Sequence, residues 1–382
     1  MPYRSCIALT LCLILCFALP LSLPINAEAK GNTPSVSAKS AILIDLEENC
    51  VLFEKNAYEK LPMASTTKIM TALVVCDLIE LDTVVSIPQS AVGVEGSSVY
   101  LCAGELLTVK DLLTALLLES ANDAAEALAV LCAGSIEEFA NKCNEKAHEL
   151  GLKNSNFTNP HGLFDENHYT TAYDLAVISA QALKNPQIRE IVSTKTAKIP
   201  LKVTAQNPFG EGVRHLKNHN KMLTNYEGAI GVKTGFTKKS GRCLVSSAER
   251  EGLCLIAVTL SAPDDWRDHT AMLDYGFANY EYKTFYETGE FNYDFPLSNG
   301  ASSTVVLTNT APLRALIKKG EEGEKINIEA HFRFAIAPIK KGEIYATAVL
   351  TVGGKVRRSS LVATQDISSN NEKNGFFESF FD

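Results

Sequence analysis

The sequence has little that could bind a metal ion or a nucleic acid. Its seven histidines form no HExxH motif and no tight His/Asp pair, and its cysteines show no CxxC spacing. A zinc site is therefore unsupported, and we expect no cofactor. The 36 Lys and Arg residues are outnumbered by 44 Asp and Glu, which gives a formal net charge of −8. Because a nucleic-acid-binding protein shows a basic face, we expect no nucleic-acid partner.

A disulfide framework is not indicated either, although the chain has ten cysteines. Cys6, Cys12 and Cys16 lie in an N-terminal apolar run, and the seven that remain cannot all pair within one chain. Most of these sit in apolar stretches, so we predict that they are buried as small hydrophobic side chains. The seven are Cys50, Cys76, Cys102, Cys132, Cys143, Cys243 and Cys254.

The N-terminus has the pattern of an export signal. Arg4 supplies a positive charge, the run from Cys6 to Leu19 is apolar and uncharged, and Ala27-Glu28-Ala29 offers small residues for a signal peptidase. We predict a signal peptide over residues 1–29 with cleavage after Ala29. An uncleaved membrane anchor and, less favoured, a lipoprotein are the alternatives. Each places the rest of the chain outside the cytoplasm, in the cell wall or at the outer face of the cytoplasmic membrane.

Residues 30–283 have the pattern of an α/β (α+β) domain. Two strands, 41–45 and 51–53, are joined by a hairpin, and two more, 243–248 and 253–260, are separated by Glu249-Arg250-Glu251-Gly252. Between them lie helices with N-terminal capping patterns at Thr108, Ser135 and Thr171. A last helix is expected around 266–275. Strands at both ends of the domain predict an antiparallel sheet that joins them.

The sequence pattern changes after about residue 284. Short Val/Ile/Thr-rich runs at 303–307, 326–334 and 344–352 alternate with turns rich in Gly, Lys and Glu, and no helical period persists. Residues 284–366 are therefore predicted to form a small all-β domain, followed by a short tail over 367–382.

Ser65-Thr66-Thr67-Lys68 is the first of three short elements that carry chemistry. Ser65 is expected at the start of a helix, where backbone N–H groups are free. Lys68 lies one turn later on the same face, so its amine can reach the Ser65 hydroxyl. A desolvated neutral lysine can activate a serine nucleophile.

The other two elements can complete such a site. Ser120-Ala121-Asn122 follows a leucine-rich helix, where Ser120 can relay a proton to a leaving amine and Asn122 can bind the substrate backbone.

Lys233-Thr234-Gly235-Phe236 is predicted to lie on an edge strand. There Lys233 and Thr234 can hold a carboxylate, and Gly235 can let the substrate approach the backbone closely. The N–H groups of Phe236 and Ser65 can form an oxyanion hole.

The order S-x-x-K, S-x-N, K-T-G is the combination of penicillin-binding proteins and class A β-lactamases. With it, this chain resembles a serine-type D-Ala-D-Ala carboxypeptidase, a low-molecular-mass penicillin-binding protein of peptidase family S11, over roughly residues 38 to 282. Further segments carry the resemblance: Leu61 to Leu73, Ser120 to Ala125, Asn159-Pro160-His161-Gly162-Leu163, and Asn218 to Leu223. Of these, the Asn-Pro-His-Gly segment is interpreted as a turn that positions a loop, so His161 is not expected to be catalytic.

The resemblance implies a substrate and a fold. The substrate would be the peptidoglycan stem peptide, cut at its D-Ala-D-Ala terminus through an acyl-enzyme on Ser65. β-lactam antibiotics would acylate the same serine as covalent inhibitors. The fold would be the penicillin-binding-protein or β-lactamase-like domain with its antiparallel sheet and helices.

The alternatives are other wall-associated proteins. A class A-like β-lactamase would show S-D-N in the second element and a glutamate that activates water, which Glu149 to Asn154 resembles only loosely. A strict transpeptidase would usually be larger. A non-catalytic cell-wall-binding protein would have no chemical need for Ser65 and Lys68.

The tail differs from that of many relatives, which end in a long basic amphipathic helix. Residues 375–382, Gly-Phe-Phe-Glu-Ser-Phe-Phe-Asp, place their phenylalanines on one helical face, but the segment is short and acidic. Basic residues normally favour anionic lipid. Peripheral membrane contact through this tail is therefore a hypothesis.

Overall fold

The structure is a computed structural model that describes residues 33–201, 212–320, 324–352 and 355–370. The predicted signal peptide and nearly all of the predicted tail lie outside the described residues. Both therefore stay predictions.

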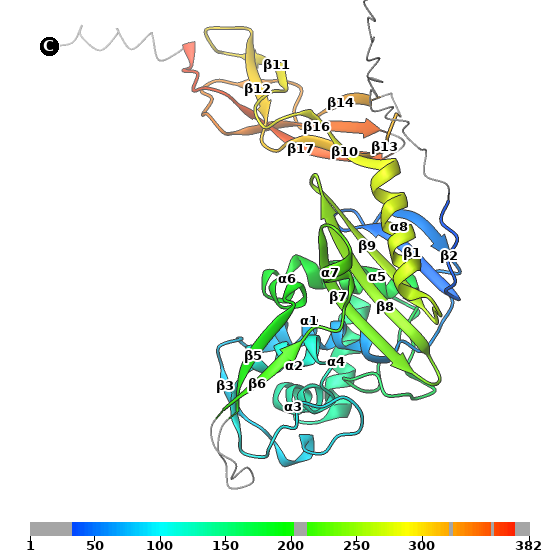
Figure 1. Cartoon of the computed structure of the whole chain (residues 1–382). Coiled ribbons are helices and arrows are strands. Elements are labelled where there is room, and N and C mark those ends of the chain that lie inside the picture. The colour runs from blue at the N-terminus through cyan, green and yellow to red at the C-terminus, as the bar shows by residue number, and fades with distance from the viewer. Residues whose placement is uncertain (1–32, 202–211, 321–323, 353–354, 371–382) are drawn as a thin grey trace, which may run out of the picture.

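A five-stranded antiparallel sheet forms the centre of the first part of the chain, in the order β2-β1-β9-β8-β7. It joins the two hairpins expected from the sequence, because Ser40 at the start of β1 pairs with Leu260 at the end of β9. β7 lies at one edge (Figure 1). The strands are β1 Ser40–Asp45, β2 Val51–Lys55, β7 Ala229–Thr237, β8 Gly241–Arg250 and β9 Leu253–Leu260.

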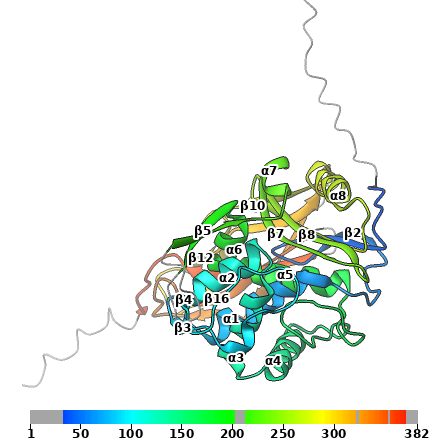
Figure 2. The same cartoon turned by 60° about the horizontal axis from the view of Figure 1, so that its bottom comes forward.

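Alternate residues of the central strands face two separate hydrophobic clusters. On β1, Ile42 and Ile44 join the larger cluster with the helices of the middle of the chain, and Leu43 joins a second cluster with Met272 of helix α8 (Asp265–Asn279). Side chains of a strand alternate between its two faces, so helices cover both faces of the sheet. Figure 2 shows α1 to α5 gathered apart from α8. The α/β fold with an antiparallel sheet is therefore confirmed.

The helices begin where the capping patterns place them. Thr108 and Asp111 form a reciprocal capping box at the start of α2, and Ser135 and Thr171 accept backbone N–H groups at the starts of α4 and α5. The helices are α1 Lys68–Leu78, α2 Val109–Leu118, α3 Asn122–Ala133, α4 Ile136–Glu149, α5 Ala172–Lys184, α6 Pro186–Ser193, α7 Met222–Asn225 and α8 Asp265–Asn279. The helix expected from Ser65 begins as a 3-10 turn, Ala64–Thr67, before α1.

Two short strand pairs lie outside the central sheet. β3 (Val84–Ser86) pairs with β4 (Leu106–Thr108), and β5 (Thr196–Leu201) pairs with β6 (Gly212–Lys217). The buried Glu105 carboxylate receives two hydrogen bonds from Arg214 of β6, at 2.6 and 2.8 Å, and so ties the second hairpin to the loop before β4.

The rest of the chain is all-β, as predicted. Six strands form one sheet in the order β14-β16-β17-β12-β11-β15, and β10 pairs with β13. Their bounds are β10 Tyr280–Tyr286, β11 Asn292–Ser298, β12 Thr304–Asn309, β13 Leu313–Lys318, β14 Glu324–Ala330, β15 Ala335–Ile336, β16 Ile344–Val352 and β17 Lys355–Ala363.

The two parts of the chain are joined by direct contacts as well as by α8. β10 runs through position 283, and the Tyr282 hydroxyl donates to Asp45 at 2.8 Å. Arg314 also forms an ion pair with Glu47. The division of the chain at residue 283 stays a prediction.

All seven cysteines of the described residues are free thiols. Cys143, Cys243 and Cys254 are buried, and Cys50, Cys76 and Cys132 are partly buried against the hydrophobic clusters, so the prediction of hydrophobic packing is confirmed for six of the seven. No helix in the described ranges is both long and apolar enough to cross a membrane.

Candidate active site

The three elements singled out in the sequence meet at one cleft of about 380 Å³. Its walls include Ser65, Ser120, Thr234, Gly235 and Phe236, which come from the 3-10 turn, the α2–α3 junction and β7. The three remaining predicted residues are buried, with exposures of 0% for Lys68, 4% for Asn122 and 1% for Lys233. The structure therefore brings segments together that are far apart in the sequence.

Lys68 is the most closely surrounded group of the site. Its Nζ lies 2.7 Å from Asn122 Oδ1, 2.7 Å from the main-chain oxygen of His161 and 3.2 Å from Ser65 Oγ. Burial lowers the pKa of this amine well below its ordinary value, and the charge of Lys233 lowers it further, while Asp123 opposes both. Lys68 is therefore a candidate for a lysine that is neutral in the folded protein.

Glycines allow the close packing around Ser65. A Cβ added at Gly235 would lie 3.0 Å from the Ser65 nitrogen, so β7 passes directly against the nucleophile turn. Gly162 has a φ of +88°, and a Cβ there would lie 1.9 Å from the Ala64 carbonyl oxygen. Gly235 was expected to admit substrate. Its observed neighbour is the Ser65 backbone, which places the N–H groups of Ser65 and β7 side by side.

Ser120 and Asn122 stand at the junction between α2 and α3. Ser120 has a φ of +61°, and Asn122 is the first residue of α3. The Asn122 amide also donates to the Glu95 carbonyl at 2.6 Å, so both ends of its side chain hold neighbouring groups. Its predicted contact with substrate is not tested by these bonds and stays a prediction.

Lys233 lies on the edge strand that the sequence predicted. Its Nζ donates to the Thr234 carbonyl at 2.9 Å. Burial lowers the pKa of Lys233 to about 7, with the Glu119 carboxylate opposing the shift. The amine is thus held beside the Thr234 segment of the cleft, where a substrate carboxylate would restore its charge.

Several cleft residues were not identified from the sequence. The cleft is also lined by Ser97, His219, Lys221, Arg242, Asp265 and Trp266. Arg242 is the cross-strand partner of Phe236 and donates to Asp265 at 3.0 Å. The strand predicted at 243–248 could have been extended back by one residue to include Arg242. Nothing in the sequence indicates, however, that α8 packs beside that residue. The His161 main-chain contact to Lys68 was also missed.

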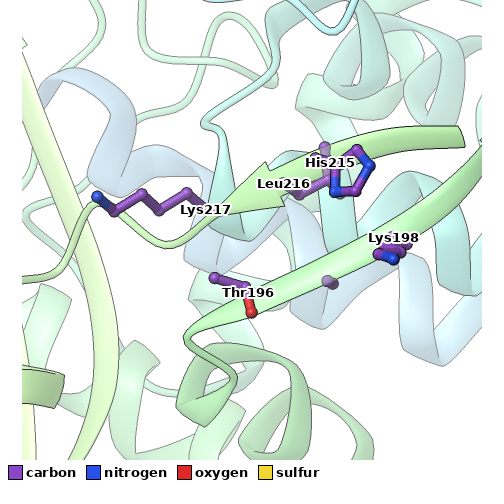
Figure 3. Close-up of a pocket in the computed structure, with 6 residues that line it drawn as sticks. Thr196, Lys198, His215, Leu216 and Lys217 are labelled. Atoms are coloured by element: carbon purple, nitrogen blue, oxygen red, sulfur yellow. The ribbon is translucent and has the colours of Figure 1, made fainter.

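A second hollow lies elsewhere and contains none of the predicted site residues. It has a volume of about 460 Å³ and is formed by the β5–β6 hairpin, with Thr196, Lys198, His215 and Lys217 along it (Figure 3). Within the described ranges, no group of three or more His, Cys, Asp and Glu residues could hold a metal ion. The candidate chemistry therefore belongs to the cleft at Ser65.

Comparison with known proteins identifies the family of the chain. The family model for D-alanyl-D-alanine carboxypeptidase matches residues 27–264. The chain is 36% identical over 338 residues to the D-alanyl-D-alanine carboxypeptidase DacF of Bacillus subtilis, across 86% of this chain and 85% of the relative. It is 31% identical to DacC of Escherichia coli over 376 residues, with 93% and 90% covered. Penicillin-binding protein 5 from Haemophilus influenzae has a similar fold, with a TM-score of 0.69, 28% identity, and 88% and 99% covered.

The fold and the comparisons define the class of protein. The chain belongs to the D-alanyl-D-alanine carboxypeptidase family, peptidase family S11. It is a hydrolase with D-alanyl-D-alanine carboxypeptidase function in the cell wall, as the resemblance of its three motifs implied.

Proposed function

We propose that this protein is a serine-type enzyme that removes the terminal D-alanine of peptidoglycan stem peptides through an acyl-enzyme on Ser65. The observation that carries the mechanism is the environment of Lys68. A neutral amine has two N–H groups and one lone pair, and two of its three neighbours, Asn122 Oδ1 and the His161 carbonyl, can only accept. Both N–H groups are therefore committed, and the lone pair faces the Ser65 hydroxyl.

The substrate would dock with its terminal carboxylate at Lys233 and Thr234 on β7. Lys68 takes the Ser65 proton as Ser65 Oγ attacks the carbonyl between the two D-alanines. The negative charge that develops on the carbonyl oxygen is met by the N–H groups of Ser65 and Phe236, which the close approach of β7 to the nucleophile turn supports.

Breakdown of the tetrahedral intermediate releases D-alanine. Lys68, now protonated, returns the proton to the departing nitrogen, with Ser120 on the wall of the cleft as the relay. Water then attacks the acyl-enzyme, frees the shortened stem peptide and restores Ser65. None of these steps uses a metal or an organic cofactor.

Export and inhibition complete the proposal. Residues 1–29 would be removed as a signal peptide, so that the enzyme acts at the cell wall or at the outer face of the cytoplasmic membrane. β-lactams present a carboxylate and a cyclic amide to the same groups, and we propose that they acylate Ser65. The name of the neighbour from Haemophilus influenzae, a penicillin-binding protein, supports the part on β-lactams, and the N-terminal sequence pattern supports the part on export.

The mature chain should release D-alanine steadily from diacetyl-L-Lys-D-Ala-D-Ala. After incubation with a fluorescent penicillin and digestion, mass spectrometry should find the adduct on the peptide that contains Ser65. No release from folded protein, together with rapid penicillin turnover, would instead support the class A-like β-lactamase. Neither release nor an adduct would support the non-catalytic wall-binding protein.

The pH dependence of kcat/KM should show the ionisation of the Lys233 amine. The pKa of this amine is lowered to about 7, so the amine is charged below that pH and loses its proton as pH rises through it. Because the charge attracts the substrate carboxylate, kcat/KM should fall as pH rises above about 7, since this ratio reports the free enzyme. Lys233→Arg keeps its charge, and its kcat/KM should hold to higher pH. An unchanged profile in that variant would assign the basic limb to another group.

A further inference from the structure

Helix α3 contributes to the surroundings of Lys68 at two points. Asn122, its first residue, accepts directly from Lys68 Nζ at 2.7 Å. Glu126 follows one turn later on the same helix face, and its Oε1 lies 3.4 Å from His161 Nε2. His161 in turn supplies, through its main-chain oxygen, the second acceptor of Lys68. Of the two acceptors of Lys68, one is therefore a residue of α3 and the other belongs to a residue whose ring lies beside α3.

The tautomer of His161 follows from its two ring contacts. Nδ1 accepts a hydrogen bond from the Leu163 backbone N–H at 3.1 Å, so the ring proton must lie on Nε2. Burial lowers the pKa of His161 to about 3, so the ring is neutral near neutral pH. The protonated Nε2 has the Glu126 carboxylate 3.4 Å away, which is the acceptor that the structure places beside it.

The loop that carries His161 is fixed closely to the nucleophile turn. Asn159 Oδ1 accepts from the Gly162 N–H at 2.7 Å, and Gly162 packs against the Ala64 carbonyl. The ring is bonded to the backbone of the same loop, because its Nδ1 accepts from the Leu163 N–H, so a shift of the ring would loosen the backbone that carries the His161 carbonyl. Since Lys68 must keep both N–H groups bonded to direct its lone pair at Ser65, that carbonyl affects the reaction.

Glu126 occupies an unfavourable place for a carboxylate. Its side chain is 16% exposed, and burial raises the pKa of its carboxyl above the ordinary value. Its partner is a neutral ring rather than a cation, so the contact does not offset desolvation as an ion pair would. A carboxylate that gains little for stability at this place suggests a role in the reaction.

We propose that Glu126 is a positioning residue for the acylation of Ser65. It accepts a hydrogen bond from His161 Nε2–H, holds the ring, and through the loop fixes the His161 carbonyl against Lys68, so that the lysine lone pair faces Ser65 Oγ. This inference rests on the proposed function, in which Lys68 is the base. Neither Glu126 nor the His161 ring touches substrate.

Two substitutions separate this role from a structural one. Glu126→Leu removes the acceptor, and we expect kcat for D-alanine release to fall on the order of tenfold with KM unchanged. The melting temperature should stay the same or rise, because a desolvated carboxylate is lost. Glu126→Gln keeps an oxygen that can accept from Nε2, and it should retain most of the wild-type kcat.

The first control makes the same Glu-to-Leu substitution at a residue that does not contact the site. Glu145 is exposed on the neighbouring helix α4 and pairs with Lys142, so Glu145→Leu should leave kcat as in the wild type. His161→Ala should lower kcat as Glu126→Leu does, and the double variant should lose no more than either single one, since the two act as a unit.

Each result decides the question. Wild-type kcat in Glu126→Leu would overturn the proposal. So would a fall in kcat that is matched by a fall in melting temperature, or a Glu126→Gln variant as slow as the leucine variant. Failure of the proposed function is distinguishable, because it would appear in the wild type itself, as absent D-alanine release or as a penicillin adduct outside the Ser65 peptide.

Discussion

Ser65→Ala is expected to abolish both D-alanine release and covalent labelling by penicillin. The variant lacks the oxygen that forms the acyl-enzyme, while Lys68 and the β7 edge stay in place. Loss of a serine nucleophile lowers kcat by about 10⁶ where it has been measured in a serine protease. Stopped assays with the D-Ala-D-Ala peptide and gel fluorescence of bound penicillin measure the two effects.

A matched control keeps this result specific. Ser193 is exposed at the end of α6 and does not line the cleft, so Ser193→Ala should behave as the wild type. Both alanine variants should have the wild-type circular dichroism and melting temperature. If the Ser65 variant still released D-alanine at a substantial rate, the nucleophile would have to be another residue.

Lys68→Arg is expected to cause a comparable loss, because arginine cannot give up its proton in a protein. The guanidinium can still donate to Asn122 Oδ1 and to the His161 carbonyl, but it cannot accept the Ser65 proton. General-base catalysis contributes about 10²–10⁴-fold, and we expect the penicillin acylation rate to fall by about that much. Single-turnover fluorescence measures this rate.

Lys68→Met provides the second test of the base. It removes the amine and leaves two buried acceptors without a donor, each at a cost of about 1–3 kcal/mol. We expect lower stability in urea for the methionine variant, together with the same loss of acylation. An arginine variant that acylates within tenfold of the wild type would show that Lys68 acts through its charge and donors, not as a base.

The arrangement of the candidate site could largely be predicted, because the residues that would carry its chemistry lie in short, ordered segments. Ser65 and Lys68 are one turn apart, so local geometry alone predicts their contact, and the structure has it at 3.2 Å. The edge position of the Lys233 strand was also predicted, and β7 ends the sheet. Capping residues likewise gave the helix starts, because their hydrogen bonds are local.

The rest could not be predicted, because it depends on contacts between distant segments. The His161 contact to Lys68 uses a main-chain oxygen, which every residue possesses, so the sequence carries no mark of it. Glu126 and Asp265 look like ordinary helix residues until α3 and α8 are placed. In the second part of the chain, β10, β11, β13, β15 and β17 were missed, since strands of mixed polarity resemble the turns around them.

The pairing of β1 with β9 has a consequence for the order in which the protein is made. β1 and its neighbour β2 are synthesised early, yet the strand on the other side of β1, β9, begins only at Leu253, and β7 and β8 come just before it. Ser65 and Lys68 are thus present on a growing chain long before the edge strand that would hold a substrate. The site therefore stays incomplete until nearly the whole first part of the chain has been synthesised.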